Sequence, residues 1–274
     1  MNVSSVCRKL KITRQNYYRR RQARQRQSVD AGLIESLVVQ ERKEQPRIGT
    51  RKLHELYQAT LLEAGVKVGR DRLFEVLREL ELLVPRQAAE SPRTTNSSHC
   101  LPVFTNRIKD LEVKKPNEVW VVDLTYIRTE MGFLYLALLT DKMSRKIVGY
   151  HCGDTLEAEG CLQALEQALA DLPEGARPIH HSDRGTQYCC HEYVNRLAES
   201  GLSVSMTETN HCAENALAER VNGILKSEYC LGRTFRCKQG ARLAVHQAVH
   251  LYNHRRPHTA LKMRFPAEVH AHAE

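Results

Sequence analysis

The sequence predicts an α/β fold, a mixed five-stranded sheet with helices on both faces, preceded by a small helical domain. Three observations lead to this prediction. Roughly the first ninety residues form Arg-rich segments with apolar positions at helical spacing. From Lys115 onward, three segments rich in β-branched and aromatic residues follow one another. After residue 155, helical and strand-like segments alternate, which is typical of a sheet covered on both faces.

The composition favours a globular protein and predicts no membrane segment. The chain has 274 residues, of which 42% are hydrophobic, and no apolar run is long enough to span a bilayer. The N-terminus lacks the apolar core of a signal peptide, so we expect a cytoplasmic protein. The nine cysteines form no CxxC pair, which favours buried thiols over disulfides. His246, His250 and His254 have helical spacing but no cysteine pair beside them, so no zinc site is expected.

The charge is distributed unevenly along the chain. The net charge of +9 divides into +8 for residues 1–92, −5 for residues 93–225 and +6 for residues 226–274. Scattered surface charges would give a more even distribution. The pattern indicates a polyanion that is bound by basic flanks while carboxylates in the middle carry out chemistry.

Residues 1–85 predict a basic helical domain. Thr13 is a candidate N-cap, Thr50 another, and the exposed candidates for DNA contact are Arg19, Arg20 and Arg21. Short Arg-rich helices joined by tight turns suit a helix-turn-helix DNA-binding module, although a plain helical bundle stays open. The expected helices span residues 3–10, 13–27, 30–45, 51–65 and 70–84. Residues 86–115 are polar and aperiodic, and they predict a linker.

Residues 116–232 predict the catalytic core, and residues 233–274 a basic C-terminal helix and tail. Asp154 and Glu157 have the spacing of a capping box before the first helix of this core. The order of elements is the ribonuclease-H-like arrangement. Strands are expected at 118–127, 132–143, 146–155, 178–183 and 202–207, and helices at 156–172, 191–200 and 214–229.

Three carboxylates are candidates for a metal site. Asp123 lies in the apolar strand VWVVDLTYI, where a metal would compensate its burial, although an exposed edge position stays open. Asp183 ends a strand before Arg184 and Gly185, which would let the backbone turn beside a phosphate. Glu219 lies within a helix.

The helix of Glu219 has a polar face with a glycine in it. Asn222, Gly223 and Lys226 follow Glu219 at helical spacing, and a glycine within a helix allows close approach to DNA. Lys226, two turns from Glu219, is a candidate phosphate contact, and Asn222 is a candidate DNA contact. A solvated helix face would also be polar.

Taken together, Asp123, Asp183 and Glu219 resemble the DDE signature of retroviral-like integrases and transposases, with 35 residues between the last two. The neighbouring segments resemble the IS-three family of bacterial insertion sequences, in particular its second reading frame. They are PNEVWVVDLTYI, FLYLALLTDKMSRKIVGY, HHSDRGTQY, SMTE, ENALAERVNGILKSEY and YNHRRPHTAL.

This resemblance implies a transposase with an integrase catalytic core, acting on element ends and target DNA near the bacterial nucleoid. The three acids would bind two Mg²⁺ ions, which Mn²⁺ could replace, for 3′-end cleavage and strand transfer. Arg255 and Arg256 resemble part of the C-terminal motif, where a structural role is as plausible as DNA contact. The resemblance also implies a homo-oligomer on DNA and an upstream-frame protein or fusion, since the chain shows no zipper-like heptads.

One residue departs from the family pattern, and two other functions stay open. Glu214 stands where many relatives have aspartate, which leaves the acidic trio unchanged. The same trio would also serve a ribonuclease-H-fold nuclease that does not rejoin DNA. A non-catalytic DNA-binding regulator of transposition is the third alternative.

Overall fold

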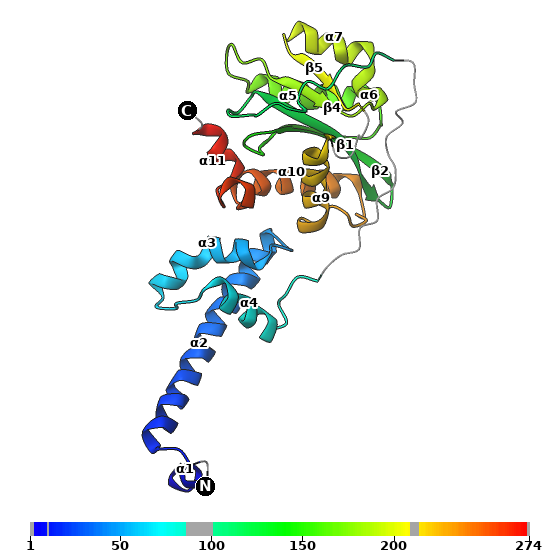
Figure 1. Ribbon diagram of the computed structural model, residues 1–274. Helices are drawn as coiled ribbons and strands as arrows, with labels where there is room; N and C mark the ends of the chain where they lie inside the picture. The colour runs from blue at the N-terminus through cyan, green and yellow to red at the C-terminus, as the bar shows by residue number, and fades with distance from the viewer. Residues whose placement is uncertain (1–2, 10, 86–100, 209–213, 273–274) are drawn as a thin grey trace. The chain divides into compact units, whose positions relative to one another are not determined.

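The structure, a computed structural model, describes residues 3–9, 11–85, 101–208 and 214–272 (Figure 1). The chain divides into two compact units, Met1–Pro85 and Arg86–Glu274. Within the described residues, no helix is long and apolar enough to cross a membrane.

The N-terminal unit is helical, as predicted. Its described elements are α1 (Val3–Lys9), α2 (Arg14–Glu44), α3 (Thr50–Glu63) and α4 (Arg70–Glu79). The Thr13 hydroxyl caps α2 by accepting the N–H of Asn16 at 3.1 Å. Ile34 of α2, Leu53 of α3 and Leu77 of α4 meet in one apolar cluster and are at most 1% exposed.

Helix boundaries in this unit differ from the prediction in three places. The helices expected over residues 13–27 and 30–45 form the single helix α2, because no proline or glycine interrupts the chain before Gly32. Gly49, rather than Thr50, is the N-cap of α3. The helix expected over residues 70–84 ends at Glu79, where the N–H of Leu82 turns back to the Leu77 carbonyl at 2.7 Å.

The second unit contains the predicted mixed five-stranded sheet, in the order β3-β2-β1-β4-β5. The first three strands form an antiparallel meander, and β4 and β5 run parallel to β1. The ribonuclease-H-like arrangement is therefore confirmed. The strands are β1 (Val119–Thr129), β2 (Gly132–Asp141), β3 (Ile147–Gly153), β4 (Ile179–Ser182) and β5 (Ser203–Met206).

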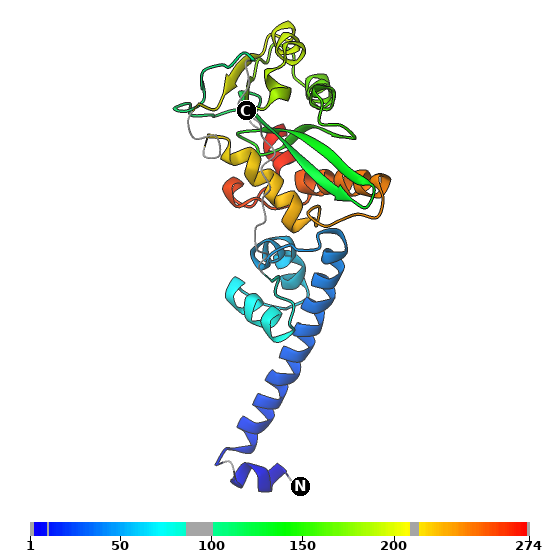
Figure 2. The same cartoon turned by 90° about the vertical axis from the view of Figure 1, so that its right-hand side faces the viewer.

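Helices cover both faces of this sheet (Figure 2). Trp120 and Val122 of β1 face α5 (Ala158–Ala170), α6 (Thr186–Cys189) and α7 (His191–Glu199). Ile127 of β1 and Leu136 of β2 face α9 (Ala216–Glu228) and α10 (Lys238–His254). This alternation follows from the two-residue period of a strand, and it places odd-numbered positions of β1 on the side of α9.

The capping box expected at α5 is absent. Glu157 occupies the N-cap position without a side-chain hydrogen bond. Asp154 instead pairs with Lys238 at 2.8 Å and with Arg242, both on α10. The carboxylate of Asp154, which the sequence spacing predicted as a helix cap, therefore forms ion pairs with two cations of a neighbouring helix instead.

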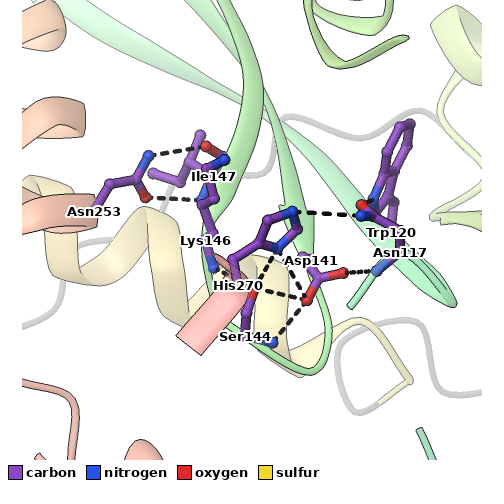
Figure 3. Close-up of polar contacts among 8 residues, drawn as sticks. All are labelled: Asn117, Trp120, Asp141, Ser144, Lys146, Ile147, Asn253 and His270. Carbon is purple, nitrogen blue, oxygen red and sulfur yellow. Dashed lines mark hydrogen bonds and ion pairs between the residues drawn. The ribbon is translucent and has the colours of Figure 1, made fainter. Parts of the chain in front are cut away.

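The C-terminal region is part of the folded core rather than a tail. After α10 come the 3-10 helix η1 (Thr259–Leu261) and α11 (Pro266–Ala271). The amide of Asn253 accepts from the Ile147 N–H and donates to the Ile147 carbonyl, both at 2.9 Å. His270 of α11 lies 2.9 Å from the hydroxyl of Ser144, which donates to buried Asp141 at 2.7 Å (Figure 3).

The segment expected as a linker also differs from the prediction. Residues 86–100 lie outside the described residues, but residues 101–115 pack against the sheet. Ile108 is 5% exposed and contacts the apolar cluster of Val119 and Val121. The N–H of Arg107 donates to the hydroxyl of Ser205 at 2.9 Å. Because the segment is mostly polar, its composition did not indicate that a few apolar residues pack against the sheet.

Candidate active site

The candidate site lies where β1 and β4 separate. The two parallel strands pair from Val119–Ile179 to Val121–His181. Asp123 and Asp183 each follow two residues later, so they project from neighbouring strands at the same end. Because β4 stops at Ser182 while β1 continues to Thr129, the sheet opens at this point. Such a carboxyl end is a common place for site residues in α/β sheets.

Asp123 is held in a strongly perturbed environment. Burial, the charge of Asp183 and, more weakly, the charge of Glu219 raise the pKa of Asp123 to about 7. Two hydrogen bonds oppose this rise by favouring the carboxylate, one from Asn222 Nδ2 at 2.8 Å and one from the Leu124 N–H at 2.9 Å. The structure therefore places Asp183 and Glu219 within electrostatic reach of Asp123.

Asp183 begins a tight turn that fixes its carboxylate. Its Oδ1 accepts the N–H of Gly185 at 3.0 Å. A Cβ at position 185 would lie 3.0 Å from the same oxygen, so glycine leaves the carboxylate uncrowded. Arg184 is half-buried and donates its Nε to the Thr207 carbonyl at 2.7 Å, which ties the turn to the chain after β5.

Helix α9 brings Glu219 and its neighbours to the strands. Glu219 lies in the first turn of α9 and is exposed. Asn215, at the N-cap, donates Nδ2 to the Val122 carbonyl at 2.9 Å, and Asn222 bonds Asp123. These two buried amides fix α9 against β1 on both sides of Glu219. A side chain at Gly223 would meet no atom within 4 Å, so this position is open toward solvent.

The donor set fits a hard divalent cation that takes further ligands from outside the protein. Within the described residues, no three His, Cys, Asp or Glu side chains converge closely enough to hold a metal on their own. Asp123 and Asp183 form the preformed part, and the buried Oδ1 of Asn222 beside them has no hydrogen-bond partner among the residues that the structure describes. Carboxylate and amide oxygens are ligands for Mg²⁺, which usually also keeps waters and phosphate oxygens.

The predicted DNA contacts fall into two groups. Arg19, Arg20 and Arg21 are exposed on α2, and Arg255 is exposed after α10. Asn222 and Arg256 are directed into the protein instead, since Asn222 is 6% exposed and bonds Asp123, while Arg256 is 3% exposed.

Arg256 and the neighbouring motif residues have structural partners. The Arg256 guanidinium forms two hydrogen bonds to Glu228, at 2.8 and 2.9 Å. Tyr252 is fully buried, and Asn253 bonds the backbone of Ile147. For these residues the structural role is the one that the geometry supports.

Lys226 is half-buried, with its Nζ 4.4 Å from the centre of the Tyr126 ring. Burial lowers the pKa of Lys226, while Asp123 opposes the change. Sequence reasoning did not single out Tyr126, although the strand alternation in TYIRTEMGF could have indicated that its exposed face carries aromatic and basic residues.

Known proteins similar to this chain contain integrase cores or are named as transposases. The family described as "Integrase core domain" matches residues 113–212 and, with a second profile, residues 200–266. The chain is 35% identical to the "Insertion element IS600 uncharacterized 31 kDa protein" of Shigella sonnei, over 96% of both chains.

Two further relatives are named as transposases. The "Transposase for insertion sequence element IS629" of Shigella sonnei is 33% identical, over 76% of this chain and 70% of that protein. The "Transposase InsF for insertion sequence IS3A" of Escherichia coli (strain K12) is 29% identical, over 94% of this chain and 90% of that protein.

A solved structure agrees with the fold. It is the simian T-cell lymphotropic virus intasome in complex with PP2A regulatory subunit B56 gamma. One of its chains has a TM-score of 0.51 and 20% identity, covering 82% of this chain and 75% of that chain. At this identity the likeness supports the fold alone.

Proposed function

Because this chain belongs to the insertion-sequence transposases with an integrase core, within the retroviral-integrase-like superfamily, we propose that it cleaves DNA 3′ ends and transfers the strands during transposition. The observation that carries this proposal is the pair of carboxylates, Asp123 and Asp183, at the point where the neighbouring parallel strands β1 and β4 separate. Glu219 on α9 is the third acid that acts on Asp123.

The proposed cofactor is Mg²⁺, in a two-ion site that Mn²⁺ can also fill. Asp123, Asp183 and Glu219 would hold the ions. When bound, the ions would lower the pKa of an attacking water or DNA 3′-hydroxyl and stabilise the leaving oxygen. The three acids would repel one another and the phosphates of the DNA. The metal ions would offset this repulsion, so metal and DNA would bind at the site together.

The chain's other residues would orient the acids and the DNA. Asn222 donates a hydrogen bond to one carboxylate oxygen of Asp123, and the Leu124 N–H donates to the other, so the two bonds fix the orientation of the carboxylate. Gly223 leaves room on α9 for the DNA backbone, and Lys226 supplies a cation next to it. Arg184, anchored on the Thr207 carbonyl, would lie near a phosphate.

The basic flanks would hold the rest of the DNA. Arg19, Arg20 and Arg21 on the N-terminal unit would contact phosphates of the element end, as in a helix-turn-helix module, and Arg255 would do so from the C-terminal region. We also propose that the active form is an oligomer on DNA. An upstream-frame protein, or a fusion with it, would supply part of the recognition of the terminal repeats.

Strand joining is the test that separates this proposal from its alternatives. The full chain, alone and co-expressed with any upstream frame, would be incubated with Mg²⁺, a duplex ending in the element's own terminal repeat, and a supercoiled target. The expected products are 3′-nicked ends and joined DNA. Nicks without joining in both preparations would indicate a nuclease, and retention without cleavage would indicate a regulator.

Asp183→Asn is the sharpest variant for the metal assignment. The substitution keeps the shape of the side chain but removes a negative ligand, so we expect Mg²⁺-dependent cleavage to fall below detection. Retention of DNA in a gel-shift assay with EDTA should stay close to the wild-type value. Full activity of this variant would exclude Asp183 as a metal ligand. Asp171→Asn, an exposed residue after α5, is the matched control and should keep activity.

A further inference from the structure

Beside the carboxylates, one edge of β1 is open among the residues that the structure describes. Strand β4 ends at Ser182, and no other described strand pairs with β1 on that side directly after Asp123. The edge is covered again only at Arg128, where the Phe235 N–H donates to the Arg128 carbonyl at 2.9 Å. Tyr126 lies on this open stretch, three residues and therefore about 10 Å along the strand from Asp123.

Aromatic side chains lie on one face of the hairpin at this edge. The Tyr126 and Phe133 rings meet edge to face, with centres 5.5 Å apart. Arg128 pairs with Phe133 in the register of β1 and β2, so these side chains share a face. The apolar cluster under α5 and α7 extends along β1 only to Leu124. Phe133 is consequently 50% exposed.

Cations surround these rings. Lys226 Nζ lies 4.4 Å and the Arg128 guanidinium 5.7 Å from the centre of the Tyr126 ring. Arg233 lies elsewhere, with its guanidinium 4.7 Å from the centre of the Phe235 ring, which belongs to the cluster on the side of α9 and α10. Glu130 in the hairpin turn is exposed, and it leaves the cations in excess. We call this surface the hairpin ledge; it consists of Tyr126, Arg128, Phe133 and Lys226.

We propose that the hairpin ledge binds an unpaired nucleotide of the DNA next to the cleaved phosphate. The base stacks on the open face of Phe133, and Arg128 and Lys226 contact the adjoining phosphates. Exposed aromatic rings among cations are what single-stranded DNA requires, because every base offers a flat face and every nucleotide a negative charge. A lone exposed Phe is common on protein surfaces, but here the ring lies within a cationic strip that starts at the candidate site.

This inference rests on the proposed function, since it assumes that DNA ends reach Asp123. It adds that the DNA is locally unpaired there. A binding assay without metal separates the two ideas, because its readout does not depend on cleavage.

The test uses the full chain in EDTA and a short duplex with a 3′ single-stranded tail. The first unpaired position carries 2-aminopurine, whose fluorescence falls when it stacks on an aromatic ring. A blunt duplex of the same sequence is the second probe. We expect the wild-type chain to quench the tailed probe and to bind it more tightly than the blunt one.

Phe133→Ala is the decisive variant. It should lose the quenching and bind the tailed duplex roughly tenfold more weakly, with unchanged binding of the blunt duplex. Phe133→Trp should restore both signals. Leu243→Ala, which truncates another exposed apolar residue at 58% exposure, is the matched control and should behave as wild type. Circular dichroism would verify that each variant is folded.

Three results would overturn the proposal. Unchanged quenching in Phe133→Ala would remove the ring from the DNA. If Phe133→Ala lost affinity equally for the tailed and the blunt duplex, the ledge would be assigned to duplex DNA. If Phe133→Ala changed the sedimentation coefficient of the protein in the absence of DNA, the ledge would be assigned to contacts between copies of the chain. If strand joining fails while the ledge signals are present, the proposed function fails and the ledge stands; the reverse outcome leaves the transposase without this nucleotide site.

Discussion

At the scale of single residues, Asn222 and Asp123 form the decisive contact. A buried carboxylate next to two other acids resists ionisation, and the pKa of Asp123 is about 7 for this reason. The hydrogen bond from Asn222 works against that resistance, since an amide N–H favours the charged form. We therefore propose that Asn222 is a positioning residue, which would act on the proposed reaction through Asp123.

Asn222→Ala should raise the pKa of Asp123 further, because the charged form loses a donor. A proton and a divalent cation compete for the same carboxylate, so Mg²⁺ binding should weaken and its pH dependence should move to higher pH. Thermal shift titrations with Mg²⁺ across pH 6 to about 9 would measure this. Ser227→Ala, an exposed change on the same helix, is the control. A lower affinity with no displacement of the pH profile would contradict the positioning role.

At the scale of elements, the packing of α9 against α10 holds Glu219 and Asn222 in place. Arg256, directly after α10, bonds Glu228 at the end of α9 and lies 5.6 Å from the centre of the Tyr252 ring. Both of these contacts are within the protein. A buried ion pair of this kind is strongly destabilising when only one partner is removed.

Arg255 and Arg256 offer a matched pair of variants. Arg256→Ala should lower the free energy of unfolding by about 3 kcal/mol, because it leaves Glu228 without its buried cation. Urea unfolding would measure the loss, and the salt dependence of DNA binding by the folded variant should stay unchanged. Arg255→Ala should reduce the salt slope of DNA binding by about one, because its exposed guanidinium would contact a phosphate. The reverse pattern would show that the two assignments are exchanged.

At the scale of the whole molecule, a buried histidine of strand β4 makes the free energy of unfolding depend on pH. His180 of β4 is fully buried, with Nε2 2.9 Å from the Tyr193 hydroxyl. Burial, aided by the neighbouring His181, lowers the pKa of His180 to about 3. The folded chain therefore keeps this histidine neutral at a pH where the unfolded chain protonates it.

The resulting stability is present above pH 6.5 and is lost as the pH falls toward about 3, since unfolding then takes up a proton. We expect His180 to contribute a loss of about 2 kcal/mol between pH 7 and pH 5. Urea unfolding at both pH values would measure it. His180→Gln should reduce this pH dependence, and His191→Gln, at an exposed histidine, should leave it as in wild type. An identical pH dependence in both variants would contradict the assignment.

The sequence determined the local elements and the identity of the acids. Strand alternation around Asp123, the turn after Asp183 and the apolar spacing on α9 depend on neighbours a few residues away, so they are visible in the chain itself. The order of five strands and their helices followed from the same signals. Continuity of α2 was missed because two separate apolar patterns were assigned to two helices where nothing breaks the backbone.

Only the tertiary structure decided which side chains are available to a ligand. Asn222 and Arg256 are polar and lie on motif segments, yet one bonds Asp123 and the other Glu228. Asp154 was assigned to a helix cap but pairs with α10. Each outcome depends on a partner that is between 28 and about a hundred residues away, which no local pattern encodes. Charge and hydrogen-bonding capacity are properties of a residue, whereas exposure and partnership are set by the fold.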